Sequence, residues 1–212
     1  MFALALLMLS SSALALDRIP TTEAEWELVY NGFGNVSFCG AEGITMQSAP
    51  VRDGSAHSVL LLAERTRKAP LSDFELRAEF MLERQLRTQG PNPWEAFWVF
   101  FNYRPVGAHK ETNYLLLKTN GVELGRAFDE KGQRFLKTES RPALALGRWY
   151  RLRIRRVGNG LRAEVDGKLA LEYSGSLKEP DRLLDAPGRI GLYTEDARVR
   201  VRSIQFGPPR SR

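Results

Sequence analysis

The segment 148–173 constrains the fold more than any other, because it predicts three consecutive antiparallel strands. In its first part, RLRIRRV, leucine and isoleucine alternate with arginine, so one face is apolar and the other is cationic. Two turns follow, GNG and DG, whose residues accept the positive φ angles that tight β-hairpin turns require. A three-stranded meander with one apolar face is unstable alone in water. The rest of the chain must therefore supply a second layer that covers this face.

The remaining chain also consists of short alternating segments separated by glycine and proline turns. No helical pattern exceeds one or two turns. This combination is typical of an all-β fold, a jelly-roll sandwich of two antiparallel sheets. The clearest predicted strands outside the meander are residues 26–30, 43–47, 58–63, 74–82, 94–103, 113–118 and 122–128.

Three segments resemble the concanavalin-A-like lectin and glucanase superfamily. They are the tryptophan-led meander with its VDGK turn, the closing segment GRIGLYTEDARVRVRSIQF and the earlier strand FELRAEFML. Within that superfamily, the chain is similar to the glycoside-hydrolase-family-sixteen-like domains of the 3-keto-disaccharide hydrolase type. The resemblance extends from about Phe74 onward. It implies a concanavalin-A-like jelly roll whose concave sheet carries a ligand groove, and a glycan hydrolase or lyase as the enzymatic activity.

Residues 1–15 predict a signal peptide. Their apolar run is too short to span a bilayer as a helix, and the ALA tripeptide fits a small-x-small site, which places cleavage after Ala15. Because no basic residue precedes the apolar run, an uncleaved amphipathic anchor is the alternative. We expect one domain over 16–207, a flexible tail over 208–212 and no transmembrane segment. The mature protein is then periplasmic or extracellular.

Composition narrows the range of partners. The net charge of +6 favours anionic partners, whereas no nucleic-acid-binding motif is present.

Cys39 is the only cysteine, so no internal disulfide is expected and a buried structural thiol is the simplest interpretation. No cofactor is predicted; oxygen-rich turns at Asp166, Glu195 and Asp196 could hold calcium, but turn formation explains these residues as well. The oligomeric state stays open.

The segment WEAFWVFFNY is unusual because both of its faces are rich in apolar residues. A central strand covered on both sides explains this composition. Alternatively, one aromatic face lines a groove, since sugar rings stack on aromatic side chains. Strict alternation gives one face with Trp94, Ala96, Trp98, Phe100 and Asn102, and an opposite face with Glu95, Phe97, Val99, Phe101 and Tyr103.

The following unit, residues 110–128, supplies carboxylate, amide, phenol and cationic side chains, a mixture suited to sugar hydroxyls. An ion pair between Glu123 and Arg126 is the simpler explanation for two of them. Together with the aromatic segment, the predicted substrate-binding residues are Trp94, Trp98, Asn102, Asn113, Tyr114, Lys118, Glu123 and Arg126.

A catalytic centre is harder to locate in the sequence. Family-sixteen glucanases carry two catalytic carboxylates on one strand as Glu-x-Asp-x-x-Glu, and this chain has no such motif. In FELRAE, Arg77 occupies the place of the middle aspartate. The remaining carboxylate candidates are Glu95, Glu111 and Glu123. A lyase would need a base and a cation, for which the candidates are Tyr114, His109, Lys118 and Arg126.

Two predicted strands carry three arginines each on one face. A solvated outer face is the simplest explanation. If the strands are close together, the repulsion between them requires an anion or nearby carboxylates such as Glu164 and Glu172. The residues of this predicted anion-binding patch are Arg151, Arg153, Arg155, Arg198, Arg200 and Arg202.

The sequence therefore predicts an exported β-sandwich that binds an oligo- or polysaccharide in an aromatic groove. One alternative is a glycoside hydrolase or polysaccharide lyase that acts in the same groove. The other is an envelope binding module that uses its arginine-rich face on an anionic partner.

Overall fold

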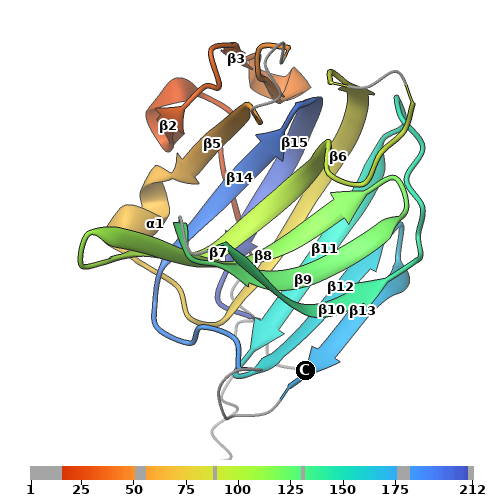
Figure 1. The fold of residues 1–212 in the computed structure, drawn as a ribbon. Helices are drawn as coiled ribbons and strands as arrows, with labels where there is room; N and C mark the ends of the chain where they lie inside the picture. Colours follow the sequence, from red (N-terminus) through yellow and green to blue (C-terminus); the bar gives the residue numbers. More distant parts are fainter. Residues whose placement is uncertain (1–15, 51–55, 88–89, 130–131, 176–181, 210–212) are drawn as a thin grey trace, which may run out of the picture.

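The computed structural model describes residues 16–50, 56–87, 90–129, 132–175 and 182–209. The predicted signal peptide and residues 210–212 of the predicted tail lie outside the described residues. The described chain folds into two antiparallel sheets stacked face to face, with few helical residues (Figure 1). The all-β sandwich expected from the sequence is thus confirmed.

Sheet A contains eight of the described strands, in the order β13-β12-β11-β6-β15-β4-β3, with β1 paired to β15. The predicted meander forms its β11-β12-β13 side. The strand bounds are Asp17–Arg18 (β1), Asn35–Phe38 (β3), Ile44–Gln47 (β4), Phe74–Gln85 (β6), Tyr150–Val157 (β11), Gly160–Val165 (β12), Lys168–Ser174 (β13) and Ala197–Gly207 (β15).

Sheet B contains seven of the described strands, in the order β10-β9-β8-β7-β14-β5-β2. Their bounds are Trp26–Tyr30 (β2), Ser58–Ala63 (β5), Ala96–Val106 (β7), His109–Lys118 (β8), Gly121–Ala127 (β9), Gln133–Glu139 (β10) and Arg189–Glu195 (β14). The helical elements are Glu23–Glu25 (η1), Gly40–Glu42 (η2) and Glu64–Lys68 (α1). No helix in the described ranges is long and apolar enough to cross a membrane.

The inner faces of the two sheets enclose the main hydrophobic core. Rings from opposite sheets meet across it: Phe80 of β6 stacks on Phe97 of β7 with centroids 5.4 Å apart, and Phe74 contacts Phe101 at 5.3 Å. The apolar residues of the meander lie in this core, as their alternation predicts. Sheet B is therefore the second layer that the meander requires.

Two edge strands have no clear signature in the sequence. Both β3 and β10 are mostly exposed or half-buried, so their side chains need not alternate between apolar and polar. Cys39 directly follows β3 and is exposed. The expectation of a buried thiol is therefore wrong, because this thiol lies at the outer rim and not between the sheets.

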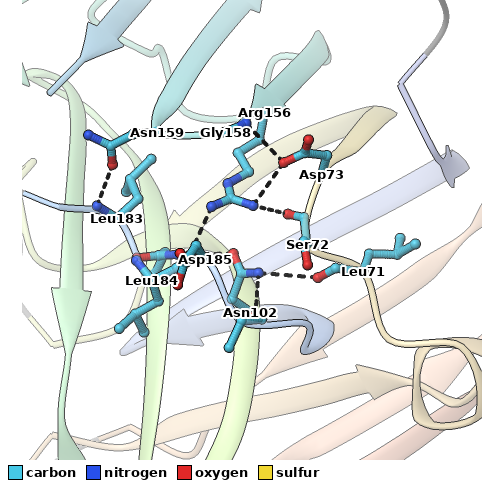
Figure 2. Close-up of polar contacts among 12 residues, drawn as sticks. Leu71, Ser72, Asp73, Asn102, Arg156, Gly158, Asn159, Leu183, Leu184 and Asp185 are labelled. Carbon is cyan, nitrogen blue, oxygen red and sulfur yellow. Dashed lines mark hydrogen bonds and ion pairs between the residues drawn. The ribbon is translucent and has the colours of Figure 1, made fainter. Parts of the chain in front are cut away.

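A buried arginine holds three segments together at one end of the sandwich. Arg156 continues the inward-facing row of β11 and is only 1 % exposed. Figure 2 shows its guanidinium donating to the carbonyls of Ser72 and Leu184 and to the carboxylate of Asp73. Asp73 also accepts a hydrogen bond from the amide of Gly158 at 2.9 Å. Arg156 thus joins β6 and β11 to the segment that leads into β14.

Replacing Arg156 with glutamine should lower the free energy of unfolding by about 2–4 kcal/mol, because buried acceptors lose a charged donor. Urea and thermal melts measure the change. Arg151→Gln on the same strand is the matched control, since Arg151 is exposed and takes no part in these contacts. Equal stability of the two variants would contradict the role assigned to Arg156.

Candidate functional site

Strand β7 has apolar side chains on both faces, and each face meets a different environment. Phe97, Val99 and Phe101 point into the core between the sheets. Trp98 and Phe100 lie on the outer face of sheet B, in a second apolar cluster. One face of the segment is therefore core, whereas the other is available to form a site.

A β-bulge interrupts the alternation near the end of β7. The register with β8 shifts between Phe101 and Arg104, and Asn102 has a φ angle of 55°. As a result, Asn102 is fully buried, whereas Tyr103 joins the outer face beside Phe100. The faces assigned to these two residues from the sequence are wrong, because strict alternation does not continue through a bulge.

The outer face of sheet B carries a cavity of about 240 Å³, which we call the aromatic pocket. Phe100 stacks almost parallel on Tyr193 with ring centroids 4.8 Å apart, and Trp98 meets Tyr193 edge-on at 5.4 Å. Polar residues from β8 and from around the β9–β10 connection complete the wall. The lining residues are Tyr30, Trp98, Phe100, Tyr103, Lys110, Glu111, Thr112, Ala127, Asp129, Gly132, Gln133 and Tyr193.

The aromatic pocket exists because sheet B curls. Tyr30 comes from one edge strand, β2, and Gln133 comes from the other, β10. In a flat sheet, six spacings of about 4.8 Å would separate these strands by about 29 Å. Side chains from both edges nevertheless line one small cavity. The outer face of sheet B is therefore concave around the pocket.

Three partly exposed phenols, those of Tyr30, Tyr103 and Tyr193, give the aromatic pocket neutral hydrogen-bonding groups. Burial raises the pKa of Tyr30 and the pKa of Tyr103 to about 12 each, and the nearby charge of Asp129 adds to both shifts. Burial also raises the pKa of Tyr193 well above its ordinary value. All three hydroxyls therefore stay protonated at neutral pH.

The charged groups at the pocket wall balance one another. Arg104 Nε donates to Glu111 Oε1 at 2.7 Å, and the backbone amide of Lys110 donates to the carboxylate of Asp129. The Lys110 side chain also lines the pocket and Arg104 is paired with Glu111 from outside the lining, so two cationic side chains accompany two carboxylates. The aromatic pocket has no net formal charge from these groups, although the whole chain carries +6.

Among the predicted substrate-binding residues, Trp98 lines the aromatic pocket. Trp94 lies just before β7, is 52 % exposed and is outside the lining. The sequence analysis missed Tyr30 and Tyr193. Alternation assigns Tyr193 to the outer face of β14, whereas Tyr30 reaches the outer face only because the register of β2 shifts between Leu28 and Tyr30. They could be assigned to one cavity only once the order of β2, β5 and β14 was known.

Tyr114, Lys118 and Glu123 form a buried cluster beside the aromatic pocket. Lys118 Nζ lies 2.8 Å from Glu123 Oε2, and the Tyr114 hydroxyl donates to Glu123 Oε1 at 3.1 Å. The Tyr114 ring packs against Trp98 with centroids 4.7 Å apart. Its hydroxyl end covers Gly125, where any side chain would collide with it. These residues support the pocket floor and do not line the cavity.

Asn102, Asn113 and Arg126 point away from the aromatic pocket and hold the segment 182–186 at the end of the sandwich. Figure 2 shows this arrangement for Asn102. Arg126 does not pair with Glu123, because residues three apart on a strand point to opposite faces. The carbonyls that accept are Ala186 for Asn102 at 2.9 Å, Leu184 for Asn113 at 2.9 Å and Arg182 for Arg126 at 3.1 Å.

The three carboxylate candidates for catalysis lie in different places. Glu95 is fully buried, and its carboxylate accepts hydrogen bonds from the amides of Leu86 and Arg87 at 2.6 and 2.8 Å. It therefore holds the connection between β6 and β7. Glu123 belongs to the buried cluster. Glu111 is the candidate that lines the aromatic pocket.

No group of three or more His, Cys, Asp or Glu side chains within the described ranges is arranged to hold a metal ion. Each turn carboxylate considered for calcium accepts a hydrogen bond from the protein itself. The donors are the amide of Arg151 to Asp166 at 2.9 Å, the amide of His57 to Asp196 at 2.9 Å and the hydroxyl of Tyr193 to Glu195 at 3.1 Å.

The two arginine rows lie on the outer face of sheet A, on either side of β6. Carboxylates of β6 stand between them: Glu75 binds Arg153 at 3.0 Å, and Glu79 binds Arg202 at 2.7 Å. Burial alone would raise the pKa of Glu75, but hydrogen bonds from Arg153 and Arg77 lower it overall. Much of the repulsion between the rows is thus offset within the face, without an external anion. Further pairs join Arg153 to Glu164, Arg198 to Glu83 and Arg200 to Glu42.

A larger hollow, of about 680 Å³, lies where the edge strands β10 and β13 run side by side (Figure 1). Its lining is mainly charged and aliphatic, and Tyr173 is the aromatic residue in it. Tyr173 is only 9 % exposed, so its ring offers little surface for stacking. This hollow lacks the aromatic platform that suits the smaller pocket to sugars.

Residues 46–207 match the family of 3-keto-alpha-glucoside-1,2-lyase-like domains. No curated protein matches the chain. Among solved structures, the carbohydrate-binding module CBM66 from Bacillus subtilis has a TM-score of 0.61 at 15 % identity, over 86 % of this chain and 94 % of that module. A Bacillus subtilis protein of unknown function with a galectin-like fold has a TM-score of 0.66 at 12 % identity, over 94 % and 99 %. The Bacillus licheniformis β-glucanase has 0.57 at 10 % identity, over 92 % and 98 %.

These structural likenesses confirm the concanavalin-A-like fold that the sequence segments imply. At such low identities they show the fold alone. The family match is different in kind, because it covers more than half of the chain and includes the closing strands. The chain therefore belongs to the family of 3-keto-alpha-glucoside-1,2-lyase-like domains.

Proposed function

We propose that the protein binds a neutral carbohydrate in the aromatic pocket. The observation that carries this proposal is the gathering of five aromatic side chains around one cavity that also has hydroxyl, amide and paired charged groups. Sugars stack their C–H faces on aromatic rings, and their hydroxyls require polar partners at the ring edge. The CBM66 module and the β-glucanase, which are named for carbohydrate binding and glucan cleavage, have the same fold.

The size and charge of the pocket narrow the ligand class. Its volume of about 240 Å³ is below the range of about 300–1,000 Å³ that is common for ligand pockets, so a small saccharide or one sugar unit of a longer chain fits best. The balanced charges at the wall give no preference for a uronate or a sulfated sugar. A neutral glycan is therefore favoured over an acidic one.

A second candidate function is the cleavage of a glycoside in the same pocket. It is favoured by the position of Glu111, a carboxylate at the cavity wall, and by the family name, which specifies a lyase for 3-keto-α-glucosides. In such an elimination a base removes the C2 proton, which the C3 carbonyl acidifies, while the C1–O bond breaks and the leaving oxygen takes up a proton. Glu111 is the residue we would assign as the base.

The proposal includes export of the protein. The first fifteen residues have the composition of a signal peptide, with a small-x-small site that ends at Ala15. Periplasmic or extracellular glycans would then be the accessible ligands.

Tyr103→Ala should weaken glycan binding by about 1 kcal/mol, or about fivefold, because one stacking surface is lost. A glycan-array screen of the wild type identifies the ligand, and calorimetry measures the affinity of each variant. Phe135→Ala is the matched control, since Phe135 is an exposed aromatic residue outside the pocket lining.

Trp98→Ala should instead cost on the order of 3–5 kcal/mol of stability, because this side chain is 4 % exposed. Absence of any bound glycan on the array would refute the binding function.

Glu111→Gln should abolish the release of aglycone from a 3-keto-α-glucoside while it leaves binding within about threefold of wild type, because only the base is removed. Turnover is followed by chromatography of the products. Glu172→Gln, on the far sheet, is the control. If the wild type binds the glycoside but releases no aglycone, the chain is a binding protein and the enzymatic candidate is wrong.

Full-length protein expressed in a bacterial host should be recovered without residues 1–15, since signal peptidase cuts after the small residue at the end of such a segment. Intact-mass measurement decides between the cleaved and uncleaved forms. Recovery of the protein with Met1 or residues 2–15 still attached would argue for the amphipathic anchor.

A further inference from the structure

Tyr193 connects the aromatic pocket to a carboxylate outside its lining. The Tyr193 hydroxyl donates to Glu195 Oε2 at 3.1 Å, and both residues belong to β14. Ser58 on the neighbouring strand β5 lowers the pKa of Tyr193 and the pKa of Tyr30 on β2, in opposition to burial. Tyr193 and Glu195 therefore form a hydrogen-bonded pair on β14, and the second pocket phenol, Tyr30, comes from β2 in the same sheet.

The number of protons on the Tyr193–Glu195 pair determines which hydrogen bonds Tyr193 can form with a ligand. A phenol has one proton to donate, and an ionised carboxylate can only accept. When Glu195 is ionised, the proton of Tyr193 is directed at Glu195, so Tyr193 has only lone pairs for a ligand. When Glu195 is protonated, the acid can donate to Tyr193, and the phenol proton becomes free.

The surroundings of Glu195 favour its protonated form more than water does. Burial raises the pKa of Glu195 above its ordinary value of 4.5. Asp196 raises this pKa further, whereas the hydrogen bond from Tyr193 and the charge of Arg87 lower it. Tyr30 on β2 also interacts electrostatically with Glu195. The carboxyl group is half-buried, so it can exchange protons with solvent.

We propose that the protonation state of Glu195 determines whether Tyr193 binds a hydroxyl or a carbonyl oxygen of the ligand in the aromatic pocket. As a carboxylate it makes Tyr193 an acceptor for a sugar hydroxyl, and as an acid it lets Tyr193 donate to a carbonyl oxygen. Glu195 is a positioning residue, because it acts through Tyr193. This inference rests on the proposed function, since it concerns the ligand of the same pocket. A keto sugar is then favoured in acid, and the corresponding hydroxyl sugar is favoured at higher pH.

The test compares methyl α-glucoside with its 3-keto form, two probes that exchange one hydroxyl for one carbonyl. Calorimetry gives both affinities between about pH 4 and about pH 8. In the wild type, the preference for the hydroxyl probe should rise about fivefold across this range, the equivalent of one hydrogen bond. In Glu195→Gln and Tyr193→Phe the preference should not change with pH. Glu172→Gln is the matched control and should retain the wild-type profile.

The outcomes distinguish an error in the proposed ligand of the pocket from an error in the proposed role of Glu195. If the wild type binds neither probe, the glucoside ligand is wrong and this inference falls with it. If Tyr103→Ala weakens binding about fivefold but the wild-type preference is the same at every pH, the pocket is supported and the role of Glu195 is overturned. A pH-dependent preference that persists in Glu195→Gln overturns it as well.

A measurement without ligand provides an independent check. The pKa of Glu195 is higher in the folded than in the unfolded chain, so its contribution to stability is present in acid and is lost as the pH rises through the folded value. Glutamine does not titrate. The melting temperature of Glu195→Gln relative to the wild type should therefore increase as the pH rises above about 4.5. A difference that is constant with pH would overturn the proposal.

Discussion

Sheet B must bury aromatic rings on both of its faces, and only one face is covered by another sheet. The inner rings of β7 pack against sheet A in the main core. The outer rings have no covering layer, yet Trp98 is 4 % and Phe100 is 7 % exposed. They are shielded by one another, by the phenols of neighbouring strands and by the curl of the sheet. Burial of apolar surface therefore favours the curl, and the curl produces the cavity.

The same curved sheet sorts its polar residues into two groups with different roles. On the outer face, phenols and paired charges surround a cavity of about 240 Å³. At the end of the sandwich, Asn102, Asn113 and Arg156 are almost fully buried, and their hydrogen bonds hold the segment before β14. We call this set of hydrogen bonds the clamp; it joins β7, β8 and β11 to the segment before β14, although Arg156 Nε has no partner within the described residues. The clamp thus fixes β14, the strand that places Tyr193 and Glu195.

The charge of the protein is unevenly divided between its two sheets. Sheet A carries arginines that are largely paired with glutamates of the same face. The pocket on sheet B is balanced and aromatic, with phenols that remain neutral because burial raises their pKa. The net charge of +6 is therefore no guide to the ligand of the pocket. It describes the solvated surface, where exposed charges contribute to solubility and to long-range attraction.

The sequence by itself determined the all-β class, the meander and the inner faces of the strands, because alternation and turn residues are local properties. It also selected Trp98, which lines the pocket that we propose as the binding site. It could not place Tyr103, because a bulge reverses the side-chain direction after Phe101. Only the tertiary structure brought Tyr30 together with Gln133, since strand order and sheet curl arise from contacts between distant segments. For the same reason, Asn113 and Arg126 resemble site residues in the sequence but serve as a structural clamp in the folded chain.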